Sequence, residues 1–389
     1  MSLEKAKGKC MKRKLILENG TEFIGEGFGS PDTKICEVVF NTSMAGYQEI
    51  ISDPSYTYQA VVMTYPLIGN YGTNEEDYET KVPTISGLIV REYNDFPSNF
   101  RCSRTLGDVM KEYGIAGISG IDTRKLNRMI RNYGTMKGLI TDADTSLEKG
   151  LEILAAENVK TDAVSRVSCS SIWESPAAGD LGEKTGKPGE TTALASEKIF
   201  RVVAIDCGMK MNIVRSLNAY GCDVVIVPWN TSAEAIEELK PDGVFISNGP
   251  GDPTDVPETI GTIRKLIGKY PIFGICLGHQ IISLAYGAKT YKLKFGHRGG
   301  NHPVKNLLTG HVEITSQNHS YAVDAESVKG TGLEITHINL LDQTVEGVRS
   351  VEDRVFSVQY HPESAPGPED SKYLFGEFIS LMKGGAVNA

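Results

Sequence analysis

Apolar residues in the second half of the chain gather in short runs separated by amphipathic stretches. Runs at 201–205, 223–227 and 243–246 have the length of buried strands. Between them, residues 211–220 and 233–239 carry apolar positions at helical spacing. Strands that alternate with helices predict a doubly wound α/β domain with a mostly parallel sheet, whose ligands bind beyond the carboxyl ends of the strands.

The first half of the chain is less regular and predicts a mixed α/β domain. Strands are expected at 15–18, 22–25, 37–41 and 60–64, and helices at 105–113, 123–133 and 147–156. Asn19-Gly20 predicts a tight turn between the first two strands, and Asp122 is the expected N-cap of the second helix. That helix carries four cations, which form either a solvated face or a surface that docks on a partner: Arg124, Lys125, Arg128 and Arg131.

Between these halves, residues 165–199 are rich in Ser, Gly, Ala, Thr, Pro and charge, a composition typical of a linker. We therefore expect an N-terminal domain at 12–164, a linker at 165–199 and a second domain at 200–385. Trp173 interrupts the linker, and an aromatic residue in such a place is expected to pin the segment to a domain surface.

One stretch places a cysteine where a strand gives way to a helix. Residues 271–275 predict a strand and 277–286 a helix, and the sequence GICLG at 274–278 matches the Gly-x-Ser-x-Gly nucleophile elbow, with Cys276 in place of serine. The flanking glycines allow a sharp turn without Cβ clashes. At a helix start, free N–H groups and the positive end of the dipole favour the thiolate, which is the nucleophilic form.

A cysteine nucleophile needs a base, and the base needs a group that orients it. Residues 354–360 alternate like a strand, and residues two apart on an extended chain point the same way, so His361 and Glu363 can lie side by side. His279 follows Cys276 by one helical turn and is the alternative base. Because its side chain would follow the helix, we expect His279 to have a packing role instead. Cys207 has no elbow around it and is not expected to react.

Thiolate attack on an amide creates a negatively charged oxygen that must be stabilised. Exposed backbone N–H groups do this without side-chain rearrangement. The glycine-rich loop SNGPGDP at 247–253 precedes the elbow, and we assign the oxyanion hole to the N–H groups of Gly251 and Leu277. A further stretch, FGHRGGNHP at 295–303, reads as a loop that shapes the site.

Three motifs together resemble the triad-type glutamine amidotransferases: SNGPGDP at 247–253, FGICLGHQ at 273–280 and QYHPE at 359–363. Three upstream stretches are similar to the small-chain family of glutamine-hydrolysing carbamoyl-phosphate synthetase: FNTSMAGYQEIISDPSY at 40–56, YPLIGNYGTN at 65–74 and IDTRKL at 121–126. The resemblance implies that Cys276, His361 and Glu363 release ammonia from L-glutamine. A large partner chain would then use ATP, magnesium and bicarbonate to make carbamoyl phosphate for arginine and pyrimidine synthesis.

The same resemblance implies a set of glutamine-binding residues: Ser55, Gly249, Gly251, Leu277, Gln280, Asn318, Ser320 and Tyr321. The chain departs from the usual family pattern at Ser320 and Tyr321, where glycine and phenylalanine are common. No cofactor is expected on this chain, since it has no phosphate-binding loop of the Walker type.

Composition argues against several kinds of binding partner, against disulfide and metal sites, and against a membrane location. A formal net charge of -9 argues against partners that need concentrated basic charge, namely nucleic acid and anionic membranes. Seven scattered cysteines predict neither a disulfide framework nor a zinc ribbon, and we expect no metal among the seven histidines. No apolar run approaches the ~18 residues of a membrane span, and the charged N-terminus is unlike a secretion signal, so a cytoplasmic protein is expected.

Three alternatives stay open at this point. The chain could be the amidotransferase subunit of another synthase, a cysteine peptidase with a similar elbow, or an inactive interaction subunit. Residues 40–56 argue against the first, the glutamine-site matches against the second and the complete triad against the third.

Overall fold

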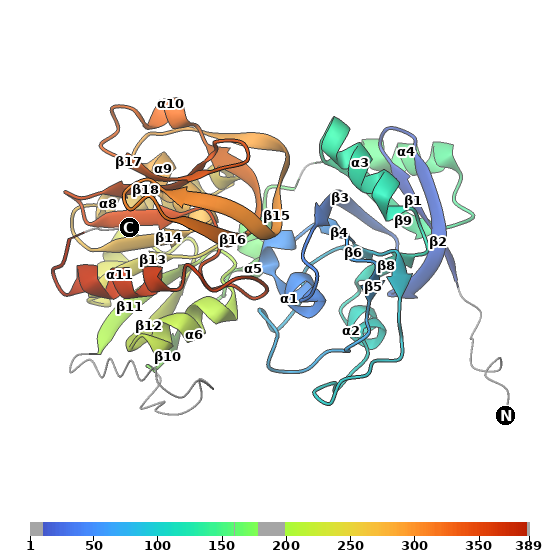
Figure 1. Cartoon of the computed structure of the whole chain (residues 1–389), viewed down its shortest axis with the longest axis horizontal. Coiled ribbons are helices and arrows are strands. Elements are labelled where there is room, and N and C mark those ends of the chain that lie inside the picture. Colours follow the sequence, from blue (N-terminus) through green and yellow to red (C-terminus); the bar gives the residue numbers. More distant parts are fainter. Residues whose placement is uncertain (1–10, 159, 178–198, 387–389) are drawn as a thin grey trace. The chain divides into compact units, whose positions relative to one another are not determined.

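The computed structural model describes residues 11–158, 160–177 and 199–386. The chain divides into two compact units, Met1–Lys160 (unit 1) and Thr161–Ala389 (unit 2), close to the expected end of the first domain. Figure 1 shows the helices and strands of each unit. In the described part of the chain, no helix combines the length and the apolar character needed to cross a membrane.

Unit 1 is built around a closed barrel of seven strands. Their order around the barrel is β1 (Lys12–Leu17), β2 (Glu22–Gly29), β8 (Ala116–Ser119), β6 (Gly87–Ile89), β4 (Gln59–Met63), β3 (Lys34–Asn41) and β9 (Met136–Asp142). The four strands expected here are confirmed. The closure of the barrel was not predicted, because it depends on β6, β8 and β9, which the sequence pattern did not single out.

Helices and short segments complete unit 1: α1 (Tyr47–Ser52), η2 (Pro54–Tyr56), α2 (Leu106–Glu112), α3 (Thr123–Tyr133), α4 (Leu147–Ala156) and the paired β5 (Leu67–Ile68) and β7 (Glu92–Tyr93). The three predicted helices are confirmed. Asp122 caps α3 as expected, because its Oδ1 accepts a hydrogen bond of 2.9 Å from the N–H of Lys125. Asp53 caps η2 in the same way, since its Oδ1 accepts a hydrogen bond of 2.9 Å from the N–H of Ser55.

Unit 2 contains one sheet of ten strands. Their order is β10 (Trp173–Ser175), β12 (Cys222–Pro228), β11 (Phe200–Asp206), β13 (Gly243–Ile246), β14 (Ile272–Ile275), β19 (Val355–Val358), β18 (Val345–Ser350), β17 (Glu334–Asn339), β15 (Thr290–Asn306) and β16 (Val312–Val323). From β12 to β19 neighbouring strands are parallel, as predicted. From β19 to β16 they are antiparallel, so the prediction of a mostly parallel sheet describes only the half that carries the elbow.

Helices cover both faces of the parallel half, which confirms the doubly wound arrangement. Val202 and Ala204 of β11 pack in one apolar cluster with α6 (Met211–Ala219) and α11 (Tyr373–Met382). Val203 and Ile205 point to the opposite face. There they pack with α7 (Ala233–Glu238), α8 (Pro257–Leu266) and α9 (Leu277–Ala285). Unit 2 also contains α5 (Ala163–Val167), η3 (Pro253–Asp255) and α10 (Ala325–Val328).

The expected linker is partly structured where it can be described. Residues 163–167 form α5, and β10 adds an antiparallel strand to the edge of the sheet, with Trp173 opposite Ile226. Backbone pairing therefore attaches the segment to unit 2, while the side chain of Trp173 is 36% exposed, so its expected role as the anchor stays a prediction. The rest of the expected linker, residues 178–198, lies outside the described residues.

Candidate active site

Cys276 lies at the sharp turn between β14 and α9. Its backbone adopts φ 53° and ψ −102°, a combination that non-glycine residues rarely adopt and that costs on the order of 1–3 kcal/mol. The N–H of Cys276 donates to the carbonyl of Val358 at 2.9 Å, which ties the turn to the end of β19. The predicted elbow is therefore present, and Cys276 itself carries the backbone strain.

The two glycines of the elbow are required for close packing. A Cβ added to Gly278 would lie 2.3 Å from the carbonyl oxygen of Ile246, and one added to Gly274 would lie 2.5 Å from Ile282 Cδ1. Neither glycine has a positive φ. The sequence argument was right that glycine is needed here, and the structure gives the reason: α9 starts directly against the ends of β13 and β14.

His361 follows β19, the parallel neighbour of β14. Ile275 and Val358 are paired in the register of these strands, so the residues after both strands emerge at the same edge of the sheet. The Nδ1 of His361 lies 2.7 Å from Glu363 Oε1, and both side chains are buried. The main-chain N–H of His361 donates to the carbonyl of Ser316 at 2.9 Å, which ties the backbone at His361 to β16.

Charge around the ring decides its protonation. Burial lowers the pKa of His361, but the charges of Glu363 and Cys276 outweigh burial and raise that pKa to about 10. The thiol therefore lies within interaction range of the imidazole. His361 Nε2 is buried, and among the described residues it makes no hydrogen bond of ordinary geometry. A looser contact of this kind is common in substrate-free sites.

Lys210 is the buried counter-charge of Glu363, and it was not predicted from the sequence. Its Nζ donates to Glu363 Oε1 at 2.9 Å and to the carbonyl of Ser364 at 2.8 Å. Burial raises the pKa of Glu363, but the charges of Lys210 and His361 outweigh burial and lower that pKa to about 2. The one available signal was position, because Lys210 follows β11 at the edge of the sheet where ligands bind.

The loop after β13 lies against the elbow. A Cβ on Gly249 would meet the carbonyl oxygen of Cys207 at 2.2 Å and Leu277 Cδ2 at 2.7 Å, so only glycine fits there. Gly251 has φ +88°. Within the described residues, the N–H groups of Gly251 and Leu277 donate no hydrogen bond, as an oxyanion hole requires. Their assignment to that hole stays a prediction.

Most of the expected glutamine-binding residues converge on the same place. Gln280 Nε2 donates to the carbonyl of Tyr321 at 2.8 Å, and the thiol of Cys276 donates to the carbonyl of Asn318 at 3.6 Å. Ser320, between them on β16, accepts through its Oγ from Arg298 Nη2. Ser55 belongs to unit 1, where it is buried in η2, so its predicted contact with glutamine remains a prediction.

His279, the alternative base, and Cys207, the cysteine not expected to react, both lie in buried surroundings away from the triad contacts. His279 is fully buried, its Nδ1 pairs with Ser357 Oγ at 2.9 Å, and burial lowers its pKa to about 3. A packing role for His279 is thus confirmed. Cys207 is buried in the apolar cluster that contains α7 and α8, and burial raises its pKa.

Two family profiles match the chain, one in each unit. Residues 203–381 match the class-I glutamine amidotransferase family, and residues 15–140 match the family described as carbamoyl-phosphate synthase small chain, CPSase domain. The carbamoyl phosphate synthase small chain of Bacillus caldolyticus is 54% identical over 96% of this chain and 97% of the relative. The chain belongs to the carbamoyl phosphate synthase small chain family.

Other members of the family are similarly related to this chain. The carbamoyl phosphate synthase small chain of Fusobacterium nucleatum subsp. nucleatum is 53% identical over 94% of this chain and 97% of the relative. Within this family, unit 2 is the glutamine amidotransferase domain and unit 1 carries the part that is specific to the small chain. The resemblance inferred from motifs is confirmed, and neither another synthase nor a peptidase finds support.

Proposed function

We propose that this chain releases ammonia from L-glutamine through Cys276, His361 and Glu363. Ammonia then passes to a large partner chain that makes carbamoyl phosphate. The observation that carries the proposal is a strained cysteine elbow beside a buried histidine–carboxylate pair, in a chain of the small-chain family.

The reaction starts from the state in which the thiol proton of Cys276 resides on His361 Nε2, a state that the raised pKa of His361 favours. The sulfur then attacks the side-chain amide carbon of glutamine, and the negative charge on the amide oxygen is stabilised by the N–H groups of Gly251 and Leu277. The imidazolium returns its proton to the amide nitrogen, so the C–N bond breaks and ammonia leaves. Water, deprotonated by His361, hydrolyses the γ-glutamyl thioester to glutamate and restores the thiol.

Glu363 and Lys210 support the ring during both proton transfers. A carboxylate 2.7 Å from Nδ1 favours the imidazolium and holds the ring so that Nε2 faces the thiol. Lys210 keeps that carboxylate ionised in a buried place, where an unpaired charge would be costly. Within unit 2, glutamine would be held by Gly249, Gln280 and the β16 residues Asn318, Ser320 and Tyr321.

The chemistry that needs ATP, magnesium and bicarbonate belongs, in this proposal, to the large partner chain. Unit 1 is where we expect the partner to dock. Its helix α3 exposes Arg124, Arg128 and Arg131, and a cavity of about 640 Å³ is lined by these arginines together with residues at the ends of β3 and β4, among them Phe40 and Thr64. In the part of the chain that is described, these arginines form no ion pair, so they are available to acidic groups of a partner.

The test is substitution of the nucleophile in the assembled enzyme. Cys276→Ala should abolish carbamoyl phosphate synthesis from glutamine and leave synthesis from added ammonia intact. Cys222→Ala is the matched control, because Cys222 is a buried cysteine of the apolar core, and it should retain both activities. Loss of the ammonia-dependent reaction in Cys276→Ala, or retention of the glutamine-dependent one, would contradict the proposed division of labour.

A further inference from the structure

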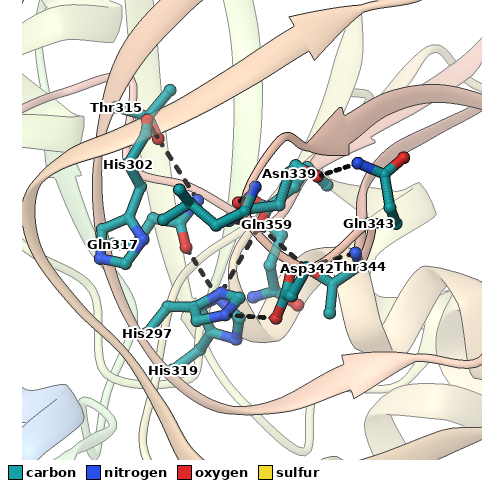
Figure 2. Close-up of polar contacts among 12 residues, drawn as sticks. His297, His302, Thr315, Gln317, His319, Asn339, Asp342, Gln343, Thr344 and Gln359 are labelled. Carbon is teal, nitrogen blue, oxygen red and sulfur yellow. Dashed lines mark hydrogen bonds and ion pairs between the residues drawn. The ribbon is translucent and has the colours of Figure 1, made fainter.

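A second group of buried ionisable side chains lies in the antiparallel half of the unit 2 sheet. His297 on β15 places Nε2 2.9 Å from Asp342 Oδ2, in the turn between β17 and β18, and Nδ1 3.7 Å from Glu346 Oε1 on β18. The rings of His302 and His319 pack around it, with centroids 5.2 Å and 4.9 Å away. Figure 2 shows these histidines together with Asp342 and Gln317. None of them takes part in the proposed proton transfers.

This histidine group is connected to the strand that faces Cys276. His297 and His319 are directly opposite residues in the pairing of β15 with β16. The Nδ1 of His319 lies 2.7 Å from the carbonyl oxygen of Tyr321, and its Nε2 lies 3.1 Å from Gln317 Oε1. Successive residues of a strand point to opposite faces. Gln317 and His319 therefore face the histidine group, while the alternate residues Asn318 and Ser320 face the other way, toward the expected glutamine site.

A second chain of hydrogen bonds leads from Glu346 to the carbonyl of Tyr321 through Gln359 and Gln280. The main-chain oxygen of Glu346 accepts from the N–H of Gln359 at 2.9 Å, and Gln359 Oε1 accepts from Gln280 Nε2 at 2.9 Å. Gln280 Nε2 also donates to the carbonyl of Tyr321. The carbonyl of Tyr321 is thus held from two sides, by His319 and by Gln280. The two connections start at His319 and Glu346, and both of these residues contact His297.

Two carboxylates close to its ring favour the charged form of His297. Burial lowers the pKa of His297, but Asp342 and Glu346 outweigh burial and raise it to about 9. Burial lowers the pKa of His302 to about 4, and burial together with the charge of His297 lowers that of His319 well below its usual value. Both nitrogens of His319 face oxygen atoms, those of the Tyr321 carbonyl and of the Gln317 side chain. Because the carbonyl of Tyr321 can only accept, Nδ1 of His319 carries a proton and donates it to that carbonyl.

A metal ion is the competing occupant. Ligand atoms of His297, His319 and Glu346 all lie within 4.8 Å of one another, and Glu346 Oε2 is buried without a hydrogen bond. However, both nitrogens of His319 already face partners, so a metal could bind only by displacing Gln317. A proton on His297 requires no such displacement, because the 2.9 Å contact with Asp342 is that of a charged hydrogen bond.

We propose that His297, anchored by Asp342 and Glu346, is a positioning residue that sets the glutamine-facing segment 318–321 through His319. The inference rests on the proposed function, since it concerns how the same site holds its substrate. Loss of the anchor should therefore weaken glutamine binding without changing the chemistry at Cys276.

The first variant is Asp342→Asn, which keeps the shape of the side chain and removes its charge. Asp342 is 40% exposed, so the change is compatible with folding. In the complete enzyme with its large partner, we expect the KM for glutamine to rise roughly threefold to thirtyfold, the range for residues that couple to a site without touching its ligand. The kcat of ammonia release and the rate of Cys276 alkylation by iodoacetamide should stay close to wild type.

The pH profile supplies a readout that a merely structural role would not change. In the wild type, His297 stays protonated up to a pKa of about 9, so its contribution to KM should be constant across the neutral range. In Asp342→Asn one of the two charges that raise the pKa of His297 is lost while Glu346 remains, so the proton leaves at lower pH than in the wild type. The KM of the variant should therefore rise with pH where that of the wild type does not. Asp342→Glu restores the charge and should recover most of the affinity.

The matched control is Asp324→Asn, which changes an aspartate at the start of α10 and should leave KM unchanged. His297→Gln, tested with the same assays, should reproduce the KM effect of Asp342→Asn. An unchanged KM in both folded variants would overturn the proposal. So would equal losses in kcat, alkylation rate and thermal stability, or stoichiometric zinc in the wild type that is lost in His297→Gln. Absence of ammonia release in the wild type would instead refute the proposed function.

Discussion

Lys210 and Glu363 form an ion pair in which both side chains are shielded from water. The Nζ–Oε1 distance is 2.9 Å, and the side chains are 4% and 0% exposed. Removing one partner of such a pair leaves an uncompensated buried charge. Lys210→Met should therefore lower the free energy of unfolding by about 3–5 kcal/mol and raise the pKa of Glu363, and the kcat of ammonia release should fall as the orientation of His361 is lost.

An exposed pair in the same unit is the natural comparison. Lys265 and Glu234 also lie 2.9 Å apart, but their side chains are 61% and 65% exposed. Lys265→Met should change the free energy of unfolding by no more than about 1 kcal/mol and leave kcat unaltered. Urea denaturation and steady-state kinetics measure both effects. Equal effects of the two substitutions would show that the buried pair has no special role.

The parts of the site that could be predicted are those encoded locally. The strand, the turn and the helix around Cys276 are contiguous in sequence, and His361 and Glu363 are two residues apart on an extended segment. Short-range geometry alone then fixes how these side chains lie. The pairing of β14 with β19, which brings the two segments together, follows the general rule that parallel strands present their loops at one edge.

The parts that could not be predicted depend on long-range pairing. Lys210 reaches Glu363 only because the sheet order brings the end of β11 near the end of β19, three strands away, and nothing local distinguishes Lys210 from any loop lysine. The segment 295–303 was expected to be a loop, since Gly299, Gly300 and Pro303 are poor strand formers. It lies instead within β15, where register shifts accommodate the irregular residues and pairing with β16 supplies the missing local preference.

The pH dependence of stability should reveal the raised pKa of His361. Its folded-state pKa is about 10 and the ordinary value is 6.5, so the folded chain holds a proton that the unfolded chain has lost between these values. The stabilisation is complete below about pH 6.5 and is lost as pH rises toward 10. Relative to His361→Gln, the wild type should lose up to about 1.4 kcal/mol of unfolding free energy per pH unit in that window.

His337 provides a comparison of opposite sign. Burial lowers its pKa to about 4, so between pH 4 and 6.5 the unfolded chain holds the proton that the folded chain lacks. Relative to His337→Gln, the wild type should then gain stability as pH rises through this lower window. Urea denaturation at a series of pH values measures both differences. A flat difference for His361→Gln between pH 7 and 9 would contradict the ion pair with Glu363.

Selective labelling should identify the nucleophile among the cysteines. A chloroketone analogue of glutamine should modify Cys276, and free glutamine should protect it. Burial raises the pKa of Cys222 to about 12 and raises that of Cys207, so both stay as unreactive thiols. Peptide mass spectrometry locates the label. Modification chiefly at Cys207 or Cys222, or full labelling of Cys276→Ala, would show that the elbow is not the reactive site.

The elbow is packed so closely that a single added methyl group, at Gly278, should disturb the active site. A Cβ at Gly278 would lie 2.3 Å from a main-chain oxygen, Ile246 O, which cannot move away as a flexible side chain could. Gly278→Ala should therefore push α9 away from β13, lower the free energy of unfolding by roughly 1–3 kcal/mol and displace Cys276 from His361, so that ammonia release is lost.

A glycine-to-alanine substitution at a position without a steric clash is the control for Gly278→Ala. It separates the clash from the general effect of replacing glycine. Gly261 lies in α8, and a Cβ added there meets nothing within 4 Å. Because alanine favours a helix over glycine, Gly261→Ala should raise the free energy of unfolding by roughly 0.5–1 kcal/mol and leave kcat unchanged. Denaturation curves and glutaminase assays of the two variants decide the matter. If Gly278→Ala behaves like Gly261→Ala, the contact between α9 and β13 does not set the position of the nucleophile.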